Sequence, residues 1–415
     1  MEKNWLNNVL SNLCTTRADI FGEKSAYLEF ESDESNKNES PLDGCNSNRF
    51  YGKIIYKDKH GNVRESESII IKRALKIWDK KITTSFSFIN EMNFYTKVAP
   101  ALSTLDVAFS SLVPKFYHGE VIFNAECDQS TIILENLKSR GYTMAEKKSF
   151  LSHQHLKLMM RKLGQFHAYS YKAKKSIPNL FYPLANNSLD SNRELNKESF
   201  GILAIVAQRG LECLQQDATY MKYIPRLREI LDNSHDVFVR ILTGDRSNPI
   251  STIVHGDYLR NNVMFKYDEN GIPNDLIMVD MATFRYGSPV IDLAIVLYMN
   301  ADQDTRNMYW DSLIDEYYTA LKETFVESEI PSKTEILAEF IDKSIYGYLI
   351  AADFLAYLMA DDDDDSPLVD VLDMHPENMT VESVIEREFT IGGKPATEAM
   401  GNILKDMIDR GFICK

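Results

Sequence analysis

The chain has 415 residues, more than one small core needs, so we expect two or three packed lobes. Its 44% hydrophobic and 26% charged residues, with 18 glycines and 13 prolines, exclude a collagen-like or wholly disordered protein. With 46 basic and 61 acidic side chains, the net charge is −15, which would repel the phosphate backbone of nucleic acid. Nucleic acid is therefore not an expected partner.

The cysteines are scattered, odd in number and without a C-x-x-C pair: Cys14, Cys45, Cys127, Cys213 and Cys414. They predict neither a disulfide framework nor a zinc site, and they fit a reducing, cytoplasmic setting. The segment Met1–Phe21 lacks the continuous apolar region of a secretory signal. The longest apolar stretch, Tyr346–Ala360, is interrupted by Asp353 and is shorter than the ~20 residues that cross a bilayer, so it predicts a buried helix and no membrane insertion.

The first twenty residues predict an amphipathic helix that docks on the rest of the protein. Its apolar residues recur at helical spacing: Trp5, Leu6, Val9, Leu10 and Leu13.

From residue 21 onward the pattern favours strands, at Ala26–Phe30, Phe50–Tyr56 and Ser68–Lys72. The polar stretch Glu31–Asn48 between the first two is too hydrophilic to bury, so we expect it on the surface. Two more apolar runs, at 121–123 and 131–134, extend this β-rich region.

One helix is expected within this region. The residues Phe88, Ile89, Met92 and Tyr95 recur every three or four positions, and Pro100 is expected to end the helix.

Beyond residue 140 the pattern becomes helical, beginning with an apolar stripe at Leu156, Met159, Met160, Leu163 and Phe166. The exception is a strand pair, Asn262–Lys266 and Leu276–Asp280, separated by turn-forming residues. The sequence therefore predicts an α+β fold with a docking helix at 1–20, a small β-rich N-lobe at 21–134, a hinge at 135–140 and a large, mostly helical C-lobe at 141–415.

The strongest functional signal is Asp257, which precedes Asn262 by five residues, together with Asp280 at the far end of the predicted hairpin. Pairing of the strands about Gly271 would set Asn262 opposite Asp280, so that two oxygen ligands face one cavity. Phosphoryl transfer uses such a set: one carboxylate accepts the proton of the substrate hydroxyl, while an Asn and a second carboxylate hold magnesium against the phosphates. The alternative, a chance H-G-D tripeptide near a turn, is disfavoured by the hairpin symmetry.

The run VHGDYLRNNVMFKYDENGIPNDLIMVDMATFRYGSPVIDLA resembles the catalytic core of the ecdysteroid kinase-like family. That family belongs to the choline-kinase-like and aminoglycoside-phosphotransferase-like group, which shares the bilobal protein-kinase fold. The resemblance extends from about residue 20 to about residue 400 and is densest from Ile253 to Asn300. It implies transfer of phosphate from ATP, with Mg²⁺, to a hydroxyl of a small molecule, ecdysteroids being the best-known substrates.

The resemblance also implies roles for individual residues. Asp257 matches the catalytic base of the family, and Asn262 and Asp280 match its metal ligands. His255 matches the residue that braces the catalytic loop, and Asp292 the acid that ties this loop down. A scaffold role for Asp292 is also expected on physical grounds, because an acid near the start of a helix is stabilising.

Lys72, at the end of the strand Ile69–Ile71, and Glu91, in E-M-N-F-Y, match the family's strand lysine and its E-x-x-F-Y helix. In kinases such a lysine binds the ATP phosphates and pairs with a helix glutamate. The alternative for Lys72 is a charge that marks only where a strand reaches the surface.

Glu135 and Leu137 resemble the linker whose main-chain groups hydrogen-bond adenine. Between the first two strands, Asn48 and Phe50 or Tyr51 match the family's phosphate loop, but the second glycine of that loop is missing. Only glycine lets backbone N–H groups approach a phosphate closely, so ATP binding is least well supported there.

Two functions compete, an active small-molecule kinase and a kinase-fold protein that binds a small ligand with little or no turnover. The complete set of acids, Asn and Lys favours the kinase, and the altered glycine loop favours the binding protein. A protein kinase is disfavoured because Asp280-Met281-Ala282 replaces D-F-G and no A-P-E follows. The resemblance implies a lipophilic, steroid-sized alcohol as acceptor, rather than choline or an aminoglycoside, and the sequence does not indicate the oligomeric state.

Overall fold

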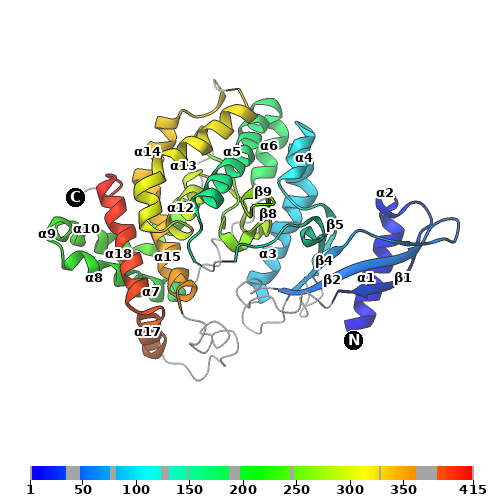
Figure 1. The fold of residues 1–415 in the computed structure, drawn as a ribbon, viewed down its shortest axis with the longest axis horizontal. Coiled ribbons are helices and arrows are strands. Elements are labelled where there is room, and N and C mark those ends of the chain that lie inside the picture. Colours follow the sequence, from blue (N-terminus) through cyan, green and yellow to red (C-terminus); the bar gives the residue numbers. More distant parts are fainter. Residues whose placement is uncertain are drawn as a thin grey trace.

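The structure is a computed structural model that describes residues 2–33, 47–74, 81–122, 130–146, 149–186, 197–243, 247–326, 329–360 and 381–413. An antiparallel sheet with flanking helices forms its N-terminal part, and the C-terminal part is mostly helical (Figure 1). The predicted α+β class, with a small β-rich lobe and a larger helical lobe, is confirmed.

Among the described residues, the sheet of the N-lobe contains six strands, β1 (Ala26–Ser32), β2 (Ser47–Lys57), β3 (Val63–Glu65), β4 (Ile69–Ala74), β5 (Phe116–Glu120) and β6 (Thr131–Glu135). Their order is β1-β2-β4-β6-β5, with β3 paired to β2. Because β4 lies between β2 and β6, its alternate residues Ile69 and Ile71 are fully buried on one face, while Lys72 faces the other side.

The apolar run at 121–123 forms no strand in the part of it that the structure describes. The edge strand is β5, and its last residue, Glu120, already faces Thr131, where the partner strand β6 begins. Val121 and Ile122 thus lie beyond the end of the ladder, and Phe123 lies outside the described residues.

Helix α1 (Glu2–Thr16) lies at one end of the molecule against the outer face of the sheet, followed by α2 (Ala18–Phe21) (Figure 1). Leu10 and Leu13 of α1 are fully buried in one cluster with Ile54 and Ile71 of the sheet. The amphipathic pattern of the N-terminal segment therefore covers a sheet face that would otherwise be exposed to water.

On the other side of the sheet, α3 (Lys81–Asn93) continues as a π-helical turn (Phe94–Val98) and then as α4 (Ala99–Ser103). The prediction that Pro100 ends the helix was wrong. The Ala99 N–H reaches back five residues to Phe94 O, and Pro100 occupies the first turn of α4, where a missing N–H costs little.

The C-lobe contains thirteen helices in the described residues: α5 (His153–Ser176), α6 (Pro178–Asn186), α7 (Lys197–Val206), α8 (Leu211–Gln215), α9 (Ala218–Met221), α10 (Ile224–Asp232), α11 (Ser234–Leu242), α12 (Val290–Met299), α13 (Gln303–Thr324), α14 (Lys333–Lys343), α15 (Ile345–Leu358), α17 (Val381–Thr390) and α18 (Gly393–Asp409). The predicted stripe of α5 is buried along its whole length. No helix in the described ranges is long and apolar enough to span a membrane.

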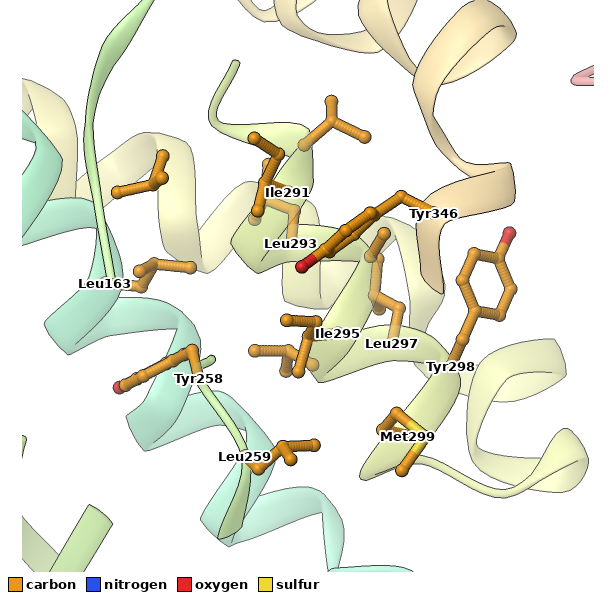
Figure 2. Packing of buried hydrophobic residues seen from close by; sticks show 14 of the residues in the cluster. Leu163, Tyr258, Leu259, Ile291, Leu293, Ile295, Leu297, Tyr298, Met299 and Tyr346 are labelled. Carbon is orange, nitrogen blue, oxygen red and sulfur yellow. The ribbon is translucent and has the colours of Figure 1, made fainter. Parts of the chain in front are cut away.

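Helix α12 lies at the centre of the C-lobe, since every one of its residues is buried. Figure 2 shows its side chains surrounded by Leu163 of α5, Tyr346 of α15 and the segment that contains Tyr258 and Leu259. A helix that is apolar on all sides must be enclosed in this way. The loop at 255–262 thus packs, through Tyr258 and Leu259, in the same cluster as a fully buried helix.

Two small strand pairs complete the C-lobe, β7 (Thr252–Val254) with β10 (Arg285–Gly287), and β8 (Val263–Tyr267) with β9 (Pro273–Met278). The β8–β9 hairpin confirms the predicted strand pair, but the predicted register was wrong by one residue. Tyr267 faces Pro273 across the turn, and a bulge beside it shifts the remaining pairs, so that Val263 faces Met278. Asn262 therefore lies opposite Val279, whose N–H donates to Asn262 O at 2.9 Å, and not opposite Asp280.

Candidate active site

A cavity of about 600 Å³, open to solvent, lies between the sheet and the hairpin of the C-lobe. The sheet contributes Arg49, Tyr51, Ile70 and Lys72. The end of β6 and the segment after it contribute Glu135 to Lys138, and the hairpin region contributes Asn262, Met264, Val279 and Asp280. Both lobes thus supply charged and apolar side chains to one pocket.

Lys72 and Glu91 form a buried ion pair beneath this cavity. Lys72 Nζ lies 2.9 and 2.8 Å from the two carboxylate oxygens of Glu91, on α3, and 3.6 Å from Asp280 Oδ1. Burial lowers the pKa of Lys72, but Asp280 and Glu91 more than offset this effect and hold that pKa above its usual value. Lys72 is therefore a charged group aimed at the pocket, and not a residue at the point where a strand reaches the surface.

Asp257 and Asn262 lie together in the loop after β7. Asn262 Nδ2 donates to Asp257 Oδ2 at 2.7 Å and to the Asp257 carbonyl at 2.8 Å. Both amide hydrogens of Asn262 are thus used in hydrogen bonds, and its Oδ1 is the side-chain atom that remains as an acceptor. The short helical turn Arg260–Asn262 brings the two side chains together across five residues of sequence.

Burial raises the pKa of Asp257 to about 6, with a further contribution from Asp280, while His255 and the hydrogen bond from Asn262 act in the opposite direction. A carboxylate whose pKa approaches neutrality is better suited to accept a proton than an ordinary aspartate.

His255 lies buried at the start of the loop that contains Asp257 and Asn262. Its ring is fully buried, Nε2–H donates to Val279 O at 3.0 Å, and Nδ1 accepts the Asp257 N–H at 3.4 Å. These contacts join the loop to the segment after β9.

Asp292 ties the same loop to α12. Its Oδ2 accepts the His255 N–H at 2.7 Å, and its Oδ1 accepts the Gly256 N–H at 2.8 Å. Asp292 also lies 3.2 Å from Nε2 of His167, whose Nδ1 is 2.9 Å from the Tyr317 hydroxyl. These contacts agree with a scaffold role for Asp292 and place His167 in the support of the loop.

Asp280 adopts a left-handed backbone conformation, with φ 62° and ψ 66°. Few residues other than glycine adopt this conformation, and such strain tends to occur at functional sites. This left-handed conformation turns the chain away from the direction of β9. It explains how Asp280 and Asn262 both line the pocket although they are not opposite each other in the hairpin. Lys72 and Arg49 keep the pKa of Asp280 below its usual value, although burial acts in the other direction.

Asn90 is a residue of this region that the sequence did not reveal. Its Nδ2 donates to Ala282 O and Phe284 O, both at 2.9 Å, and so joins α3 to the segment after Asp280. These residues are about 190 positions apart, and no local pattern indicates such a contact.

The donor set fits a magnesium ion bound together with phosphates. Asp280 offers a carboxylate and Asn262 an amide oxygen, and Mg²⁺ usually takes one or two protein oxygens and completes its octahedron with phosphate and water. In the described residues no group of three His, Cys, Asp or Glu side chains could bind a metal alone.

The end of β6 and the segment after it border the apolar part of the cavity, which is lined by Tyr51, Ile70, Leu134 and Met264. Glu135 and Leu137 both line it. The Glu135 N–H already donates to Lys115 O at 2.9 Å, so the main-chain group that Glu135 can offer a ligand is its carbonyl.

The structure does not bring Asn48 to the cavity, because β2 alternates its faces there. Arg49 and Tyr51 line the pocket, whereas Asn48 is exposed, and Phe50 points to the α1 side and contacts Trp5. Arg49, which the sequence pattern did not indicate, lines the cavity instead. Alternation along the strand was the signal that could have identified it. Gly44 to Asn46 of the expected loop lie outside the described residues.

The ecdysteroid kinase-like family matches residues 48–328, and the chain belongs to this family. It is thus a small-molecule kinase, an enzyme that transfers phosphate to an alcohol group. No curated protein matches the sequence.

Solved structures with low sequence identity resemble the whole chain. A microcompartment-associated aminopropanol kinase is 10% identical, with a TM-score of 0.44, over 98% of this chain and 99% of that one. The ethanolamine kinase of Plasmodium vivax is 14% identical, with a TM-score of 0.39, over 90% and 84%. The choline kinase LicA of Streptococcus pneumoniae is 13% identical, with a TM-score of 0.37, over 96% and 98%.

Proposed function

We propose that this protein is an ATP- and magnesium-dependent kinase that transfers the γ-phosphate to a hydroxyl of a small, lipophilic molecule such as an ecdysteroid. The observation that supports it most is the convergence of Asp257, Asn262 and Asp280 beside the Lys72–Glu91 ion pair. The steroid-like acceptor rests on the family description alone, and a cytoplasmic location on the scattered cysteines.

In this proposal each residue has one task. Asp257 accepts the proton of the acceptor hydroxyl, and its raised pKa suits that role. Lys72, held by Glu91, binds phosphate oxygens, and main-chain groups of Glu135 and Leu137 contact the base. Asn262 and Asp280 would hold magnesium, which neutralises charge on the transferred phosphate.

Asp257→Asn tests the base directly, because the amide keeps the shape and loses the proton acceptor. We expect turnover of ATP with a hydroxylated acceptor to fall on the order of 10²- to 10⁴-fold, with little change in ATP affinity. Asp304→Asn, which removes an exposed carboxylate of α13, is the matched control.

The acceptor is found by incubating the wild type with γ-labelled ATP, magnesium and a panel that includes ecdysteroids and other alcohols. A labelled ecdysteroid would support the full proposal. ATP binding measured by calorimetry, without any labelled product across the panel, would replace it with a kinase-fold binding protein.

A further inference from the structure

Arg49 and Lys72 place two cations side by side on one face of the sheet. They are direct partners in the antiparallel pairing of β2 with β4, and both line the cavity. Directly opposed side chains of an antiparallel pair are close neighbours, and two like charges in this relation destabilise a sheet. An anion bound between them would relieve that repulsion.

Two carboxylates, those of Glu91 and Asp280, face these two cations. Lys72 already forms its short contacts with Glu91, and Asp280 lies farther away, at 3.6 Å. The charge of Arg49 acts on Lys72, Glu91 and Asp280, which places the guanidinium in the electrostatic environment of all three. A metal ion at Asp280 would remove part of the negative charge there and increase the need for a bound anion.

The backbone of residues 47–52 forms a strand and not a glycine loop. Residues 47–52 pair with β4 residue by residue, from Ser47 opposite Ala74 to Gly52 opposite Ile69. Gly52 is required for strand packing, since a Cβ there would lie 2.2 Å from Glu31 O. The glycine of this strand therefore admits the neighbouring strand β1, and phosphate binding along residues 47–52 would rely on side chains.

We propose that the Arg49 guanidinium binds oxygens of the nucleotide triphosphate beside Lys72, in the role that backbone N–H groups have in a glycine-rich loop. This inference rests on the proposed function, that is, on the cavity being a nucleotide site. Arginine is suited to the task because its planar fork donates two parallel hydrogen bonds to phosphate oxygens.

The test compares ATP with adenosine by titration calorimetry, in the absence of acceptor. For Arg49→Ala we expect ATP affinity to fall about 10- to 100-fold, as for the loss of charge-assisted hydrogen bonds, while adenosine affinity changes less than about twofold. Arg49→Lys, which keeps the charge without the fork, is expected to lose less than Arg49→Ala does. Arg64→Ala removes an exposed arginine of β3 in the same sheet and should leave both affinities unchanged.

The outcomes separate this inference from the function on which it rests. If the wild type binds ATP and Arg49→Ala binds it equally well, Arg49 has no phosphate role and the proposed function stands. If ATP and adenosine weaken together in both Arg49 variants, Arg49 only stabilises the lobe, and the inference is overturned. If the wild type binds neither ligand, the nucleotide site itself is wrong. Thermal melting of each variant shows whether it is folded. If Arg49→Ala does not fold, the ATP and adenosine affinities of Arg49→Lys decide whether Arg49 has a phosphate role.

Discussion

The carboxylate of Asp292, in the first turn of α12, accepts the backbone N–H of His255 at 2.7 Å. It also accepts the N–H of Gly256, a residue with φ 85° whose Cβ, if present, would lie 2.3 Å from Thr283 O. A fully buried helix thus fixes the backbone that leads to Asp257.

Asp292→Asn places an amide N–H₂ against one of these two N–H donors. Leaving a buried donor unsatisfied costs about 1–3 kcal/mol, so we expect urea denaturation to show a loss of that size. Catalytic turnover should fall as well, because the loop loses its anchor, whereas ATP affinity should change little. An Asp292→Asn protein with wild-type stability and turnover would contradict the scaffold role.

The Lys72–Glu91 pair should show strong coupling in a double-mutant cycle. Lys72→Met leaves the Glu91 carboxylate, which is 2% exposed, without its partner, and this typically costs about 3–5 kcal/mol. The double variant Lys72→Met/Glu91→Gln removes both charges, so we expect it to be more stable than Lys72→Met alone. Denaturation curves of the four proteins measure the coupling, and additive losses would show that the two residues stabilise the fold independently.

The sequence indicated those parts of the site that depend on short-range pattern. A lysine at the end of an apolar strand and a glutamate on the next helix are adjacent features of the chain, and they lie 2.8 Å apart. The contacts of Asn90 with the segment after Asp280 join distant segments, and only the packed lobes determine them.

Register was harder to predict than the presence of strands. The hairpin residues identify β8 and β9, but neither the turn centre nor the bulge beside Tyr267 can be read from residue type. Asn48 was expected at the phosphate loop, whereas Arg49 and Tyr51 line the cavity, because side chains one residue apart in a strand point to opposite faces of the sheet. The left-handed conformation of Asp280 could not be foreseen, because only a small fraction of residues other than glycine adopt it and residue type does not show which ones.

Helix α1 should contribute directly to the stability of the N-lobe. Leu10 is fully buried against the sheet, so Leu10→Ala should destabilise the protein by about 2–5 kcal/mol through lost burial and the cavity left behind. Ser11→Ala, on the exposed side of the same helix, is the control and should change little. Chemical denaturation of the full chain measures both variants. Equal stability of Leu10→Ala and the wild type would mean that α1 does not hold the sheet.

Stability should decrease as the pH falls below neutrality, and His118 on β5 is one cause. Burial lowers the pKa of His118 below the ordinary 6.5, Arg17 lowers it further and Glu120 partly opposes them, while its Nε2 has no hydrogen-bond partner among the described residues. Above about pH 7 the side chain is neutral in both the folded and the unfolded state, so it contributes no pH dependence there. As the pH falls through 6.5, the unfolded chain takes up a proton that the folded protein does not yet bind, which favours unfolding.

Urea denaturation at about pH 7.5 and about pH 5.5, on either side of the ordinary histidine pKa, measures this difference. In His118→Gln the decrease in stability between the two pH values should be smaller than in the wild type. It should not vanish, because burial also lowers the pKa of His153 and His155. His60→Gln, which replaces an exposed histidine in the turn after β2, controls for the substitution itself. If His118→Gln keeps the full pH dependence of the wild type, the buried His118 ring is not the group that takes up the proton on unfolding.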